Sequence, residues 1–168
     1  MKIDSSLMFD PARVAGMASQ LEEAGFDGAY TFEGQSDPFI TVAAAAMNTQ
    51  RMELMTSIAV AFSRNPMNLA YLGNDLQNLS EGRFILGLGT GVQRVNEDWH
   101  NAQWGKPVAH LRETIGIIRE FVKSCTEGVP IEIEGEFEHL RLKGYQRTYR
   151  RERDSIPIYL AGVGPVML

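Results

Sequence analysis

The stretch Leu79–Gly91, which reads LSEGRFILGLGTG, decides the fold of this chain. Its centre, Phe84–Leu88, is apolar on successive residues, as is typical of a strand buried on both faces of a parallel sheet. A helical pattern beginning at Asn65-Pro66 leads into it. The stretch ends in glycines, which allow the backbone to approach another group closely. It therefore predicts a helix end, a turn at Gly82 and a strand of a βα fold.

The same unit recurs along the chain. Asn or Asp followed by proline supplies an N-cap and a first helical residue. Three such pairs recur at intervals of 27 and 28 residues, the spacing of βα units in a (β/α)8 barrel or an open doubly wound sheet. Helices are expected from Asp10-Pro11 to Gly25, from Asp37-Pro38 to about Asn48, from Asn65-Pro66 to about Gly82, and over Pro107–Lys123. Strands are expected at Ile3–Phe9, Gly28–Phe32, Leu54–Phe62, Phe84–Leu88 and Ile156–Ala161.

The expected fold class is α/β: a partial TIM (β/α)8 barrel of about four βα units plus a fifth parallel strand. Alternating apolar residues within about 130–143, with a turn near Glu134-Gly135, predict an inserted β-hairpin outside the main sheet. A complete barrel needs about 250 residues, and this chain has 168. We interpret residues 1–168 as one N-terminal half barrel. Its open edges predict a homodimer or another partner.

Composition limits the partners. Sixteen Lys and Arg against 21 Asp and Glu give a net charge of -5, which argues against nucleic acid or an anionic membrane. The single Cys125 excludes an internal disulfide and fits a reducing compartment. No uncharged run is long enough to span a bilayer. We therefore expect a cytoplasmic protein acting on a small-molecule substrate. The three histidines, His100, His110 and His139, lack metal-site spacing, and His110 is expected on a helix surface.

Functional residues of parallel βα folds gather at the C-terminal ends of the strands. Glu33 follows the second expected strand and is either a proton-handling group or an ion-pair or capping residue. Asp37 is expected only as an N-cap. The segment Gly87–Gly91 has three interpretations: a turn without a ligand, a phosphate or flavin site, or the first motif of an S-adenosylmethionine-dependent methyltransferase. That last motif usually carries an acidic residue where this chain has Gly87. The polar segment Gly144–Ser155 is either a solvated loop or a site for an anionic group.

Several stretches together resemble the luciferase-like monooxygenase superfamily. The most specific is Leu79–Gly91, which matches the pattern LSxGRFxLGxGxG typical of that superfamily. The segments Gly25–Glu33, Thr56–Pro66 and Pro157–Pro165 are similar to its second, third and fifth strands. Ala59–Pro66, together with the run from Glu33 to Phe39, is closer to the branch that uses coenzyme F420 than to the FMN branch.

The resemblance implies a TIM barrel that binds a flavin-type ring at the C-terminal mouth. The reaction would be hydride transfer between coenzyme F420 and a small organic substrate, or monooxygenation if the coenzyme is FMN. It further implies a bulge in the third strand with a cis peptide bond at Ser57-Ile58, which supports the ring. Some F420 enzymes have a catalytic histidine after the second strand, where this chain reads Glu33-Gly34-Gln35, so Glu33 is left as the catalytic candidate. The cofactor contacts implied by the resemblance are Ser57, Ile58, Ala59, Gly89, Thr90, Gly91, Asn96, Gly162 and Gly164.

Overall fold

A computed structural model describes residues 1–7, 10–148 and 152–162. Its main sheet is entirely parallel, in the order β1-β2-β3-β5, with β4 on the β3 side of β5 and β8 on the other side. The strands are β1 (Asp4–Ser6), β2 (Gly28–Thr31), β3 (Glu53–Thr56), β4 (Ala59–Val60), β5 (Phe84–Gly89) and β8 (Ile158–Leu160). The expected partial barrel is confirmed, and the sheet does not close on itself.

Within the described ranges, four α-helices connect these strands. They are α1 (Pro11–Glu23), α2 (Pro38–Ala46), α3 (Pro66–Leu79) and α4 (Pro107–Ser124). The side chains of Asp10, Asp37 and Asn65 accept backbone N–H bonds at the starts of α1, α2 and α3, as the Asx-Pro pairs predicted. Among the described residues, no helix has the length and apolar character needed to cross a membrane.

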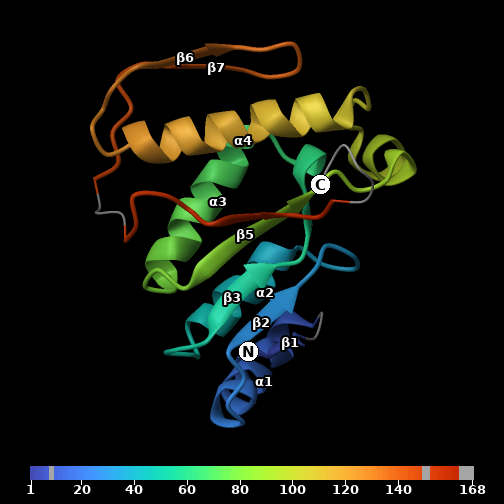
Figure 1. Ribbon diagram of the computed structural model, residues 1–168, viewed down its shortest axis with the longest axis vertical. Helices are drawn as coiled ribbons and strands as arrows, with labels where there is room; N and C mark the ends of the chain where they lie inside the picture. Colours follow the sequence, from blue (N-terminus) through green and yellow to red (C-terminus); the bar gives the residue numbers. More distant parts are fainter. Residues whose placement is uncertain (8–9, 149–151, 163–168) are drawn as a thin grey trace.

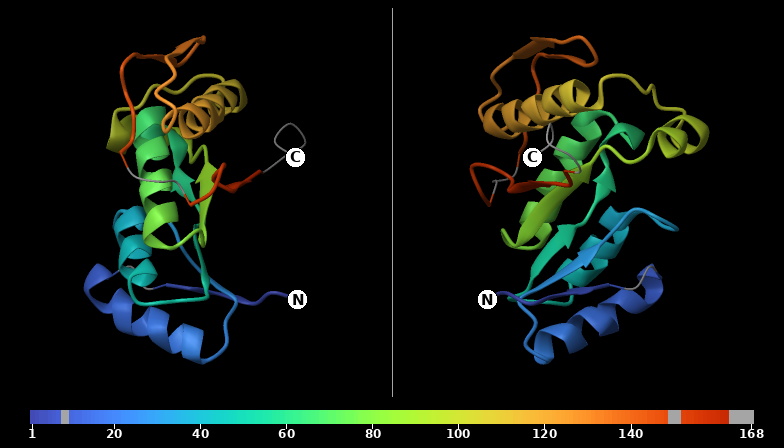
Figure 2. Two further views of the ribbon diagram at one scale, coloured as in Figure 1. Left: turned by 90° about the vertical axis from the view of Figure 1, so that its left-hand side faces the viewer. Right: turned by 45° about the vertical axis from the view of Figure 1, so that its right-hand side comes forward.

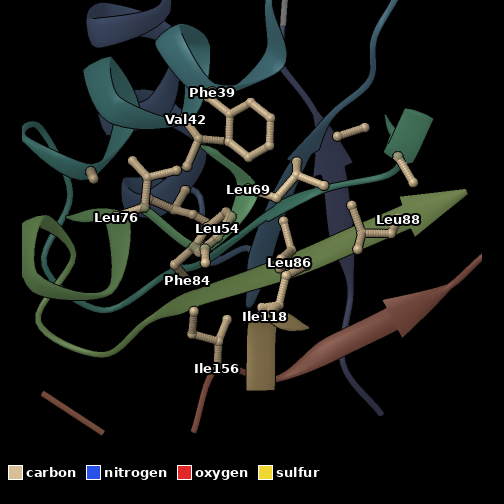
Figure 3. Packing of buried hydrophobic residues seen from close by; sticks show 14 of the residues in the cluster. Phe39, Val42, Leu54, Leu69, Leu76, Phe84, Leu86, Leu88, Ile118 and Ile156 are labelled. Carbon is tan, nitrogen blue, oxygen red and sulfur yellow. The ribbon is translucent and has the colours of Figure 1, made fainter. Parts of the chain in front are cut away.

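The helices cover one face of the sheet and leave the other uncovered, as the side view in Figure 2 shows. The core lies between the helices and the covered face. Leu54 and Leu86 of the sheet are fully buried there with Leu69 of α3 and Ile118 of α4 (Figure 3). On the edge strand β8, Tyr159 and Leu160 are about half exposed. This arrangement is that of a barrel wall with its interior side open.

The third expected strand, Leu54–Phe62, is wrong as a continuous element. It divides into β3, β4 and the 3-10 turn Ala61–Ser63. Leu54 and Met55 pair with Phe84 and Ile85, whereas Ala59 pairs with Leu88. Three residues, Thr56–Ile58, therefore stand opposite two on β5. This β-bulge bends the strand where the sequence pattern showed only an apolar run.

The predicted hairpin is confirmed as β6 (Ile131–Glu134) and β7 (His139–Leu142), an antiparallel pair beside α4 and outside the main sheet (Figure 1). Its turn is held by Glu113 of α4, whose carboxylate accepts the N–H groups of residues 136, 137 and 138. Burial opposes ionisation, but these N–H bonds outweigh it and lower the pKa of Glu113. Glu113 thus anchors the hairpin turn to α4.

The prediction that His110 is a surface residue is wrong. Its ring stacks between Phe62, with ring centres 4.1 Å apart, and Phe137, at 5.0 Å. Its Nε2 lies 2.7 Å from Oε1 of Glu138 on the hairpin turn. The hairpin, which sequence periodicity cannot place relative to the helix, covers this side of α4. His110 therefore joins the hairpin to the 3-10 turn after β4.

Candidate functional site

The glycines at the end of β5 are explained first by packing within the protein. A Cβ atom on Gly87 would overlap the carbonyl oxygen of Thr56, and one on Gly89 would lie 3.0 Å from the Ile58 side chain. The Thr56 hydroxyl accepts the Gly87 N–H at 2.9 Å and donates to the Gly87 carbonyl at 2.7 Å. These contacts close the bulge of β3 and β4 against β5. The two glycines thus bring the bulge and the glycine-rich turn side by side.

The turn after β5 is shaped by Asn96. This residue is fully buried, and its Nδ2 donates to the carbonyls of Thr90 and Val92 at 2.8 and 3.0 Å. Its Oδ1 is buried and has no hydrogen-bond partner among the described residues. Gly91 has a φ of 65°, which favours glycine. The described part of the chain provides no hydrogen-bond acceptor for the N–H groups of Thr90 and Gly91. Free N–H groups at such a turn are suited to bind an anion.

The remaining predicted cofactor contacts lie beside this turn. The peptide bond between Ser57 and Ile58 is cis, where the resemblance placed it. Ser57 is exposed, whereas Ala59 is fully buried in the pairing with β5. Gly162 follows Ala161, whose N–H donates to Leu88 at the end of β5. The structure therefore brings the ends of β4, β5 and β8 together. Gly164 lies outside the described residues.

Glu33, the catalytic candidate, lies in a nearly buried ion pair. Its carboxylate receives Nη1 of Arg64 at 2.8 and 3.0 Å and the Val60 N–H at 2.7 Å. The Ser63 hydroxyl donates to the same carboxylate at 3.3 Å. Glu33 is only 10% exposed at its side chain, and Arg64 is 14% exposed. The sequence left a proton-handling role and an ion-pair role open, and the geometry shows the ion pair.

Asp37 does more than the predicted capping. One carboxylate oxygen accepts the Phe39 N–H at 2.8 Å, and the other accepts Nη2 of Arg64 at 2.7 Å. Arg64 also lies over the Phe39 ring at 5.1 Å. Burial disfavours the cationic form of Arg64. The hydrogen bonds to Glu33 and Asp37 outweigh that effect and raise its pKa. The guanidinium therefore clamps the ends of β2 and β4 to the start of α2.

A pocket of about 520 Å³ opens on this cluster. Its wall includes His100, whose Nε2 lies 4.0 Å from Oε1 of Glu33. His100 follows a π-helical turn, Val95–Trp99, and its side chain is 29% exposed. The pocket lies at the C-terminal ends of β2 and β4, where parallel βα folds place their chemistry. Glu33, Asp37, Val60, Arg64, Trp99 and His100 are among the lining residues.

Comparison with known proteins shows the family of this chain. A family model described as luciferase-like monooxygenase matches residues 2–168. The chain belongs to the luciferase-like monooxygenase family. An uncharacterized protein of Mycobacterium tuberculosis is 39% identical over 168 residues, which cover 99% of this chain and 49% of that protein. A putative coenzyme F420-dependent oxidoreductase of the same species is 33% identical over 162 residues, with 92% of this chain and 47% of that protein covered.

A solved structure supports the fold of this luciferase-like chain. The oxygenating constituent of 3,6-diketocamphane monooxygenase from Pseudomonas putida, in complex with FMN, superposes with a TM-score of 0.80 at 18% identity. The match covers 95% of this chain and 51% of that one. The chain thus spans about half the length of the relatives it matches.

Two residues of this luciferase-like pocket, Arg64 and His100, were not predicted from the sequence. Arg64 follows the apolar run that ends at Phe62, and a charged residue at a strand end was the available signal. His100 had no such signal, because its approach to Glu33 depends on the path of the segment after β5. Of the two interpretations left open for Gly144–Ser155, a solvated loop or a site for an anionic group, the second gains no support from Arg147, which binds Asp75 on α3.

Proposed function

We propose that this chain forms the coenzyme-binding N-terminal half of an F420-dependent oxidoreductase, in which hydride passes between the coenzyme and a small organic substrate. The observation that carries the proposal is the convergence of the ends of β4, β5 and β8 beside a turn with free N–H groups. A coenzyme with an anionic tail suits that turn. Bound F420 accepts or gives the hydride, and the protein supplies binding and orientation.

The residues of this chain fit such a group in specific ways. The N–H groups of Thr90 and Gly91 are available to phosphate oxygens, and Ser57 presents an exposed hydroxyl beside them. The unpaired Oδ1 of Asn96 is an acceptor that the protein itself does not use. The bulge would support the ring, and Gly162 would lie near the phosphate. FMN is the alternative coenzyme, with monooxygenation as its reaction.

The first test is a titration of the purified protein with F420 and, separately, FMN, followed by coenzyme fluorescence. We expect saturable binding of F420 at micromolar concentration or tighter. Thr90→Arg would place a long side chain in the turn and abolish binding. Gln20→Arg adds the same charge on the exposed side of α1 and should leave the affinity unchanged. Equal affinity of the Thr90→Arg variant and the wild type would refute the assigned site.

A second proposal is a half barrel whose role depends on a partner, either a second copy or another chain. It is favoured by the exposed side chains Tyr159 and Leu160 on the edge strand β8, which present apolar surface to solvent. A monodisperse, folded monomer in analytical ultracentrifugation would count against it. The methyltransferase interpretation has less support, because Gly87 and Gly89 face Thr56 and Ile58 of the protein itself.

A further inference from the structure

We propose that His100 is the residue that exchanges a proton with the substrate, with Glu33 as the carboxylate behind its ring. The substrate would be a small uncharged alcohol, or the corresponding carbonyl compound in the reverse direction. The inference rests on the proposed function, because the hydride must pass to a bound coenzyme. It assigns the acid–base role to a residue from the segment after β5, whereas the sequence had pointed to Glu33 itself.

The hydrogen bonds of Glu33 make it a poor proton carrier but a good fixed anion. Both of its carboxylate oxygens are occupied, by the guanidinium of Arg64 and by the N–H of Val60. Such charge-assisted bonds hold the carboxylate in place. A group that exchanges protons with a ligand needs a nitrogen or oxygen that is not already saturated. Glu33 lacks one, so its role is to position and stabilise its neighbour.

His100 has the free nitrogen that Glu33 lacks. Its Nε2 lies 4.0 Å from Oε1 of Glu33, within ion-pair range but beyond a hydrogen bond. Among the described residues, its ring takes part in no hydrogen bond, and it lines the 520 Å³ pocket. A ligand hydroxyl can therefore reach an imidazole nitrogen, and the carboxylate stabilises the charge that forms when the ring takes up a proton. Glu33 acts on the ring through its charge at 4.0 Å, and His100 is the group of this pocket placed for general acid–base chemistry.

The segment after β5 holds His100 in this place. Asn96 is buried and binds the carbonyls of Thr90 and Val92, and its own carbonyl accepts the Ala102 N–H at 2.9 Å. Asn101 has a φ of 51°, which turns the chain directly after the histidine. The same asparagine thus fixes both the turn proposed for the coenzyme and the segment that carries His100. Val60 connects the two places, because it lines the pocket with His100 and its side chain lies beside Gly91 of the turn.

The charge of the pocket indicates the substrate class. Glu33 and Asp37 bring two carboxylates against the single guanidinium of Arg64, whose donors are already paired with them. Among the described residues that line the pocket, a phosphorylated or carboxylated substrate would meet net negative charge and no free cation. Trp99 and Val95 contribute apolar surface to the same pocket. A small uncharged hydroxyl compound fits both features.

The step balances with the imidazole of His100 as proton acceptor and the coenzyme of the proposed function as two-electron acceptor. The oxidised deazaflavin coenzyme, when bound, would take the hydride that leaves the substrate carbon as its C–H bond breaks with the electron pair. The hydroxyl proton passes to the free imidazole nitrogen of His100, and the C=O bond forms. The substrate is oxidised by two electrons and the coenzyme is reduced by two. The reverse reaction returns the proton from His100 to the carbonyl oxygen.

The test compares wild type, His100→Gln and the control His139→Gln, whose histidine is exposed on the hairpin. F420 affinity is measured by fluorescence. Reduction of bound F420 is followed with a panel of small primary, secondary and cyclic alcohols and with glucose 6-phosphate. We expect all three proteins to bind F420 equally. His100→Gln should reduce kcat with alcohols about 100-fold, within the range of a lost acid–base residue. His139→Gln should be unchanged, and the phosphorylated compound should be inactive.

A second measurement does not depend on turnover. Diethyl pyrocarbonate modifies accessible imidazoles, and mass spectrometry locates the modified residue. His100 should be modified more slowly when F420 and an alcohol are bound, whereas His139 should react at the same rate. Full F420 affinity with an unprotected His100, an unchanged kcat in His100→Gln, or no reduction by any alcohol would overturn the inference and leave the coenzyme site standing. Failure to bind F420 or FMN would overturn the proposed function as well.

Discussion

Replacement of Arg64 by methionine is the sharpest test of how the pocket is built. The Arg64 side chain is 14% exposed and binds the side chains of Glu33, 10% exposed, and Asp37, 38% exposed. Removing one partner of a buried ion pair typically costs 3–5 kcal/mol, because the other charge is left buried and unpaired. Glu33 keeps the Val60 N–H at 2.7 Å, and Asp37 is partly solvated. We therefore expect a loss at the lower end, about 3 kcal/mol.

The assay is a double-mutant cycle followed by urea unfolding and circular dichroism. Glu33→Gln in the Arg64→Met background removes the stranded charge. The double variant should therefore be more stable than the sum of the two single losses predicts. We expect a coupling energy of about 1.5 kcal/mol or more, as found for residues in contact. Arg13→Met is the control, because the Arg13–Asp10 pair is exposed on both sides and separated by 3.4 Å. Such a pair contributes below about 1 kcal/mol.

Additivity of the two losses within about 0.5 kcal/mol would refute the reasoning. It would mean that Glu33 finds other partners or solvent when the guanidinium is gone. A loss for Arg13→Met as large as that for Arg64→Met would refute it too, since burial would then not distinguish the pairs.

Three further outcomes are expected. Gly87→Ala should destabilise the protein by more than about 3 kcal/mol in urea unfolding, because the added Cβ would overlap the Thr56 carbonyl. The control is Gly116→Ala on α4, where a Cβ would meet open space; it should stabilise the protein by about 0.5–1 kcal/mol. Burial opposes the charge of Glu22, but the backbone N–H groups of residues 50–52 donate to its carboxylate and lower its pKa below 4.5. The stabilisation by this carboxylate is therefore present above pH 4.5 and is lost as acid protonates Glu22 in the folded state. Glu22→Gln should lower the urea midpoint at pH 7 but leave it unchanged at a pH below the lowered pKa. Glu113→Gln should speed hydrogen exchange in β6 and β7 and leave α4 protected; unchanged exchange in the hairpin would show that Glu113 does not anchor it.

The sequence allowed the fold to be predicted where local rules act. The Asx-Pro pairs located three helix starts, and successive apolar residues located β5, because capping and burial on both faces are encoded within a few residues. The interruption of the third strand was placed at Ser57-Ile58 by resemblance alone. A bulge depends on the register with β5, which periodicity within one strand does not contain.

The site was less predictable than the fold. Glu33 and the segment Gly89–Gly91 were identified because they follow strands, and strand ends converge in parallel sheets. Arg64 was missed because its partners, Glu33 and Asp37, lie 31 and 27 residues away in the sequence. His110 was misplaced for the same reason, since the hairpin that covers it is a later segment of the chain. Contacts between segments distant in sequence leave no periodic trace.

The extra residue between β3 and β4 determines which face of the sheet each later side chain of the strand points to. Side chains alternate between the two faces of a sheet, so one added residue exchanges the faces from Ala59 onward. The Val60 N–H reaches the Glu33 carboxylate only with this number of residues in the strand. Deleting Ser57 would rotate that N–H away, although every chemical group of the pocket would remain in the chain. The number of residues between Thr56 and Ala59 is thus as strict a requirement as any side chain. An insertion or deletion of one residue there would turn every later side chain and N–H group of the strand to the opposite direction.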